Sequence, residues 1–77
     1  MRKKNWFKSL KPGDLIELEG GFIRKVFMVG LDWVSTVGID TSLDNSELIA
    51  NLALSIEFPS YRIKRKLSNA EKAAELI

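Results

Sequence analysis

The fold of this chain is decided by residues 15–39, LIELEGGFIRKVFMVGLDWVSTVGI. Alternating apolar and charged residues predict a strand over 15–19, and Gly20-Gly21 is typical of a tight hairpin turn. Two further strands follow, over 22–29 and 33–39, separated by a short turn that contains glycine and aspartate. Three consecutive strands joined by short turns predict an antiparallel meander.

The strand predicted over 22–29 is apolar on both faces. One face carries Phe22, Val26 and Met28, and the other carries Ile23, Phe27 and Val29. A sheet wetted on one side needs only one apolar face, so this strand predicts a second layer. That layer is either the same sheet closing into a barrel or a helix packed across its back.

A short helical segment is predicted before the meander. Asn5 can cap it, and the segment carries Trp6, Phe7 and Leu10. The turn residues Lys11-Pro12-Gly13-Asp14 end it. We expect the rings of Trp6 and Phe7 to fill the open end of a barrel.

Residues 44–58 fit two periodicities. Asp44 and Glu47 resemble a capping box, whereas the apolar residues from Leu48 to Phe58 alternate as in a strand. We predict a helical turn near 45–50 that passes into a strand near 52–58.

The C-terminal part predicts a last strand over 61–66 and then a helix. Ser68 and Glu71 form a capping box, and the helix behind it has a narrow apolar face that can approach a sheet closely, made by Ala70, Ala73, Ala74 and Ile77. The whole chain, 1–77, is predicted to be a single small globular domain, mostly β (β-rich α+β). Its architecture is either a small SH3-like barrel or a meander sheet of about five strands with a C-terminal helix.

The opening Trp6-Phe7-Lys8-Ser9-Leu10-Lys11-Pro12-Gly13-Asp14, followed by a strand and Gly20-Gly21-Phe22, resembles short phage and prophage accessory proteins with SH3-like barrels. The resemblance extends to a closing Tyr-Arg-Ile strand and a charged helix over 61–77. It implies a setting of phage biology and host-directed accessory roles. It carries no functional residue across, because that class of protein shares no activity.

The residues available for catalysis are few, because the chain contains no His and no Cys. The commonest general base, metal ligand and thiol nucleophile are therefore missing. Asp40, Asp44 and Glu47 flank one loop but lack the spacing of a calcium loop, so they are interpreted as solvated turn and cap residues. We predict that the protein is not an enzyme and has no cofactor and no bound metal.

Charge is strongly segregated along the sequence. Basic residues concentrate near the two ends, at Arg2, Lys3, Lys4, Lys8, Arg62, Lys64, Arg65 and Lys66, whereas residues 26–60 contain acids and no base. In an extended strand Arg62, Lys64 and Lys66 would point the same way and form a positive ridge. Lys and Arg displace counterions from phosphates, and Trp6 or Tyr61 could stack on a base. The leading hypothesis is a non-catalytic binding module for nucleic acid or for a host protein that handles it.

Two other functions stay open. In the first, the acidic region 32–57, with Asp40, Asp44 and Glu47, mimics phosphate charge in an inhibitor or adaptor of a host enzyme or defence complex. In the second, the chain is a structural component of a virion or larger assembly. The alanine face of the terminal helix could pair with a copy of itself, which would give a homodimer.

A cytoplasmic location is predicted, in the host cell if the gene is a phage gene. The absence of Cys suits a reducing compartment. Lys8 and Lys11 interrupt the apolar run that a signal peptide needs, and no apolar stretch is long enough to span a membrane.

Without His or Cys to titrate, the melting temperature and any ligand affinity should change little between about pH 6 and 8. Addition of EDTA or of a reductant should leave both unchanged, because no metal or disulfide is expected to support the fold. A melting temperature that drops sharply in EDTA would contradict the metal-free prediction.

Overall fold

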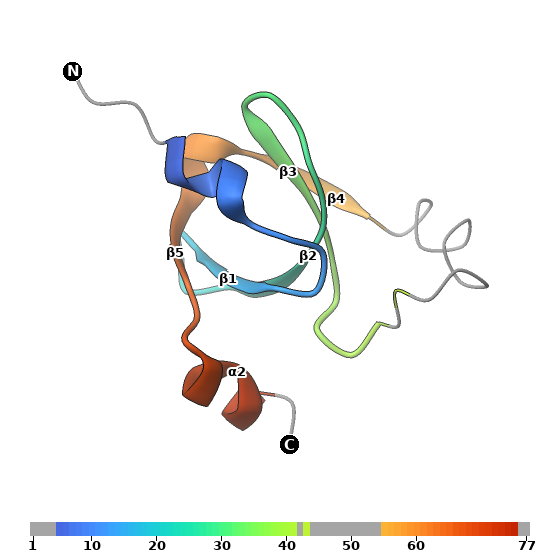
Figure 1. Cartoon of the computed structure of the whole chain (residues 1–77), viewed down its shortest axis with the longest axis vertical. Helices are drawn as coiled ribbons and strands as arrows, with labels where there is room; N and C mark the ends of the chain where they lie inside the picture. Colours follow the sequence, from blue (N-terminus) through green and yellow to red (C-terminus); the bar gives the residue numbers. More distant parts are fainter. Residues whose placement is uncertain (1–4, 42, 44–54, 76–77) are drawn as a thin grey trace.

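The fold is known from a computed structural model that describes residues 5–41, 43 and 55–75. In chain order the elements, with η for a 3-10 helix, are η1 (Asn5–Ser9), β1 (Leu15–Leu18), β2 (Ile23–Val29), β3 (Trp33–Val37), β4 (Ile56–Pro59), η3 (Ser60–Arg62), β5 (Ile63–Lys66) and α2 (Asn69–Glu75) (Figure 1). The strands form one antiparallel sheet in the order β4-β3-β2-β1-β5. The predicted β-rich α+β fold with a meander and a C-terminal helix is confirmed.

The sheet is coiled but is not closed into a barrel. Its two edge strands, β4 and β5, are joined by the three residues of η3. Four Cα–Cα steps between Pro59 and Ile63 cover at most about 15 Å. In a flat sheet of five strands, the edges would lie about 19 Å apart. The sheet must therefore curl until its edges approach each other, and Figure 1 shows the strands wrapped around a common interior.

Two register shifts support this curvature. One lies between Val26 and Met28, where β2 pairs with β3, and the other lies between Glu17 and Leu18, where β1 pairs with β5. Such bulges bend a strand and increase its twist. The first shift also corrects the predicted facing of β2. Val29 packs against the same core as Val26, while Met28 is exposed, because Phe27 adds one residue to the alternation.

The core fills the inside of the coil. It consists of the buried residues Phe7, Leu10, Ile16, Leu18, Val26, Val34 and Ile63, with Val29 and Phe58 packed against them. Phe7 comes from η1 and Leu10 follows directly after it, so this N-terminal segment covers part of the interior, as expected for Phe7.

The outer face of the sheet is buried in part as well. Leu15 and Val37 both pair with Lys25, which places the three side chains in one row on the face opposite Ile16. The Lys25 ammonium donates a hydrogen bond to the Thr41 carbonyl at 2.6 Å, which brings the chain after β3 to this face. The turn after β3 thus lies on this face, and it is neither of the two second layers predicted from the apolar strand.

Helix α2 does not supply this layer. None of its residues is buried, and Ala70, Ala73 and Ala74 are all exposed. The expectation that its alanine face packs on the sheet is therefore wrong for these positions, and Ile77 lies outside the described residues. The predicted homodimer through this helix stays a prediction.

Several predicted boundaries shift. β3 ends at Val37 instead of Ile39, and the last strand begins at Ile63, because residues 60–62 form η3. β4 begins at Ile56, within the predicted strand 52–58, of which residues 52–54 lie outside the described part. The helical turn predicted near 45–50 lies outside it entirely.

The two aromatic residues of η1 differ in burial, and the expectation for Trp6 is wrong. Phe7 is 3% exposed, whereas Trp6 is 38% exposed. A 3-10 helix has about three residues per turn, so adjacent side chains point in different directions and only one of two neighbours can enter the core.

Replacement of Phe7 by Ala should therefore lower the free energy of unfolding by about 3–5 kcal/mol, through lost burial and a residual cavity. Trp6→Ala should cost only about 1 kcal/mol, as for an ordinary point substitution. Urea titrations of both variants, with Phe7→Leu as a milder control, measure the difference. Equal losses for Trp6→Ala and Phe7→Ala would contradict the assignment of Phe7 as the core residue.

Candidate functional site

The predicted basic ridge does not exist as a single strand face. Arg62 belongs to η3, while Lys64 and Lys66 belong to β5, so the three residues do not share one strand alternation. The β1–β5 register shift also falls at Lys64, since Glu17 pairs with Arg65 and Leu18 with Ile63. Among the other predicted cations, Lys8 is exposed with its ammonium 5.7 Å from the Phe7 ring centroid. Arg2, Lys3 and Lys4 lie outside the described residues.

Each of the four cations at 62–66 has an acidic neighbour from β1 or the turns beside it. The ion pairs are Arg62–Glu19 at 3.6 Å, Lys64–Glu17 at 3.8 Å, Arg65–Glu17 at 2.8 Å and Lys66–Asp14 at 3.8 Å. The cation of each pair is exposed, so each pair adds only about 0–1 kcal/mol to stability, but the pairs offset the positive charge locally. The outer surface of β1 and β5 is therefore of mixed charge, which the separate charge counts along the sequence did not predict.

Arg65 also holds the start of α2. Its guanidinium donates to Glu17 and Glu71, both at 2.8 Å. Ser68 and Glu71 form the predicted capping box, with the Ser68 N–H donating to the Glu71 carboxylate and the Glu71 N–H donating to the Ser68 hydroxyl. The hydrogen bond from Arg65, and then that from the Ser68 N–H, lowers the pKa of Glu71 to about 2.

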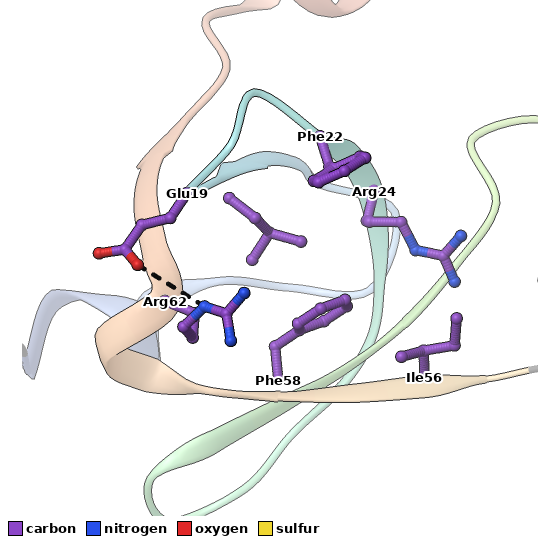
Figure 2. Close-up of a pocket in the computed structure, with 7 residues that line it drawn as sticks. Glu19, Phe22, Arg24, Ile56, Phe58 and Arg62 are labelled. Atoms are coloured by element: carbon purple, nitrogen blue, oxygen red, sulfur yellow. Dashed lines mark ion pairs between the residues drawn. The ribbon is translucent and has the colours of Figure 1, made fainter.

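A pocket opens where the β1–β2 hairpin turn faces β4 and η3. Its volume is about 240 Å³, and it is lined by Leu18, Glu19, Phe22, Arg24, Ile56, Phe58 and Arg62. We call this the mouth pocket. Figure 2 shows Phe22 and Phe58 on opposite sides of the opening, with Arg62 towards one end and Arg24 towards the other. The lining is mostly apolar, with the charged groups at its rim.

Phe22 is placed at the rim by the glycine turn before it. Gly20 and Gly21 have φ of 94° and 88°, a region that residues with a Cβ rarely adopt. A Cβ on Gly20 would also lie 3.1 Å from the Phe22 ring, so the ring rests close against the turn. Although apolar, Phe22 is 66% exposed, which makes its ring available to a ligand.

Strand β4 supplies the opposite wall. Ile56 and Phe58 alternate with Glu57, and only the first two line the pocket. Phe58 packs against the core, so its ring is anchored, whereas Ile56 is 49% exposed. The pocket therefore has one fixed aromatic wall.

Arg24 is fixed by the buried Thr36. Its Nε donates to the Thr36 hydroxyl at 3.0 Å and its Nη2 to the Thr36 carbonyl at 3.3 Å, while the Thr36 hydroxyl donates to the Ile56 carbonyl. These bonds use two of the five N–H donors of the guanidinium. The side chain is thus held in place while keeping a charge at the rim.

Arg62 is held from the other side by Glu19. The side chains lie 3.6 Å apart, and the Glu19 N–H donates to the Arg62 carbonyl at 2.9 Å. In Figure 2 the Glu19 carboxylate lies on the outer side of the pocket, and the Arg62 guanidinium extends towards Phe58.

Sequence reasoning assigned only Arg62 of these pocket residues to a functional surface. Phe22 is assigned there to a strand face, and Arg24 is given no role. The available signal was the pair Arg24-Lys25 inside a strand with two apolar faces, because it places one charge on each face and a buried or half-buried charge needs a reason.

The acidic residues proposed for partner binding are described only in part. Asp40 is exposed in the turn after β3, and Asp44 and Glu47 lie outside the described residues. The described part of the chain contains no group of three or more potential metal-ligating side chains, and none of its helices has the length and apolar character needed to cross a membrane.

Comparison with protein-family models, curated proteins and solved structures finds no match to this chain. The phage setting implied by the resemblance of the N-terminal segment stays a prediction, and the function must be argued from the site itself.

The Arg65–Glu71 contact predicts a specific pH response. The folded pKa of Glu71 lies below its ordinary value of 4.5, so the contact stabilises the start of α2 fully above that value. This stabilisation should be lost as the pH falls through about 2. An NMR titration of the Glu71 side chain and the Ser68 amide measures it.

Arg65→Ala serves as the control, because it removes the main cause of the shift and leaves the Ser68 hydrogen bond. In this variant the pKa of Glu71 should move up towards its ordinary value. Titration of wild-type Glu71 at its ordinary pKa would show that the contact does not form in solution.

Proposed function

We propose that this chain is a non-catalytic binding module and that single-stranded nucleic acid is the ligand of the mouth pocket. The observation that carries the proposal is the placement of two arginines, Arg24 and Arg62, at a pocket walled by the phenylalanines Phe22 and Phe58. The proposal keeps the cytoplasmic setting predicted from the sequence.

The two residue types suit the two parts of a nucleotide. Phenyl rings offer flat apolar surfaces on which an unpaired base can stack, worth about 1–3 kcal/mol per base. Arginine binds phosphate through several N–H donors and does not lose its charge at physiological pH. Ligands that combine a flat ring with a nearby anion therefore match both features of the pocket.

A single strand fits this site better than a duplex. In a duplex the bases are stacked inside and phosphates face outwards, so the best complement is a bare basic surface. The surface of β5 has its cations paired with Asp14 and Glu17. The apolar pocket, by contrast, gains binding energy only from a base that has left its stack.

The inhibitor that uses Asp40, Asp44 and Glu47 and the structural component of a virion remain alternatives. They need no role for the mouth pocket. Removing its arginines therefore separates them from nucleic-acid binding.

The test is the salt dependence of binding to a fluorescent oligothymidylate, measured by anisotropy from about 50 mM salt upwards. Each phosphate contact with a single strand contributes about 0.7 to the slope of log affinity against log salt. Arg24→Gln with Arg62→Gln should therefore weaken binding and flatten the slope by about 1.4.

Lys64→Gln with Lys66→Gln is the matched control. It removes the same charge from β5, outside the pocket, and should change the slope much less. Melting temperatures of both double variants check the fold, and Arg62→Gln alone provides a readout if loss of the Arg24–Thr36 bonds destabilises the protein. Absence of salt-dependent binding by the wild type at about 50 mM salt would refute the proposal.

A further inference from the structure

The size of the mouth pocket limits what can enter it. Its volume of about 240 Å³ lies below the roughly 300–1,000 Å³ of pockets that enclose a whole small-molecule ligand. The pocket can therefore accept one ring system, with the rest of the ligand outside. A chain that presents one base at a time satisfies this limit.

The two arginines lie at different ends of the space that a ligand ring would occupy. In Figure 2, Phe22 and Phe58 face each other across the opening, whereas Arg62 and Arg24 lie towards its two ends. A group between the rings would thus have a guanidinium on each side. One anion next to the ring would engage one arginine, and engaging both requires an anion on each side.

The geometry points to a site for one internal nucleotide of a single strand. Its base enters between Phe22 and Phe58, and the phosphates on its two sides contact Arg24 and Arg62. This inference rests on the proposed function and adds to it the number of bases bound and the need for a phosphate on both sides.

Glu19 lies beside Arg62 in this site. Its carboxylate pairs with Arg62 at 3.6 Å, longer than a direct charge-assisted hydrogen bond of about 2.7–2.9 Å. Both side chains are exposed, at 44% for Arg62 and 58% for Glu19, so the pair is weak and can open when phosphate arrives. Until then it keeps the guanidinium beside the pocket.

The experiment uses pentanucleotides with equal phosphate numbers. The first has a single thymine at its centre and abasic sugars elsewhere, the second is fully abasic, and the third carries its only thymine at the 5′ end without a terminal phosphate. The first should bind the full-length protein about 5- to 160-fold more tightly than the second, the range expected for one stacked base. It should also bind more tightly than the third, whose base lacks one flanking phosphate.

Variants assign these differences to residues. Phe58→Leu should reduce the advantage of the central base over the fully abasic strand, while Leu31→Ala, at a residue 81% exposed outside the pocket, should not. Arg62→Gln should remove most of the difference between the central and terminal bases. Phe22→Leu provides a second aromatic test if Phe58→Leu melts at a lower temperature.

The outcomes separate this inference from the proposed function. Equal binding of the central-base and abasic strands, with salt-dependent binding intact, overturns the base site and leaves nucleic-acid binding standing. Equal binding of central and terminal bases overturns the requirement for two phosphates. If no strand binds, the proposed function fails as well. If a peptide with Trp between two Asp residues competes better than any strand, the pocket is a protein-binding site and the inference is wrong.

Discussion

The three-residue connection η3 between the two edge strands is the constraint on which this structure depends. Strands β4 and β5 are neighbours in sequence but lie at opposite edges of the sheet, so a short link can join them only if the sheet coils. Coiling makes one face concave and allows a single small core, part of which is covered by Phe7 of η1 and by Leu10 just after it. It also brings Phe58, just before the link, and Arg62, at its end, to the rim that they share with Phe22.

The same constraint determines which positive charges are paired with carboxylates of the protein itself. Because β5 pairs with β1, its lysines and Arg65 lie beside the carboxylates that precede and occupy β1. The sequence separates these charges by about fifty positions, and the sheet brings them together, with Glu17 receiving both Lys64 and Arg65. A basic run that looks exposed in the sequence thereby becomes part of a mixed surface. Arg24 and Arg62 differ because both line an apolar pocket.

Features that depend on neighbouring residues were predictable, and those that depend on distant pairing were not. The Gly20-Gly21 hairpin and the Ser68–Glu71 capping box follow from local backbone preferences, and both are found. The extra residue at Phe27 leaves no local signal, since an apolar residue suits either face of a doubly apolar strand. The mouth pocket combines residues 18–24 with residues 56–62. No periodicity in either segment alone shows that they meet.

The open end of the coil and the exposed ring of Phe22 both go with the unclosed sheet. A small domain buries only a limited part of its surface, so its apolar residues cannot all enter the core. Phe7 and Phe22 have the same side chain, but Phe7 is 3% exposed and Phe22 is 66% exposed. Hydrogen bonding between β4 and β5 would close the barrel and draw the two edges together, narrowing the opening between η3 and the β1–β2 turn. The unclosed sheet lacks that pairing. It keeps the Phe22 ring, the mouth pocket and the guanidinium groups of Arg24 and Arg62 together at its surface. Such an arrangement leaves apolar surface exposed in the free protein, and a partner that covered the ring would recover the lost burial.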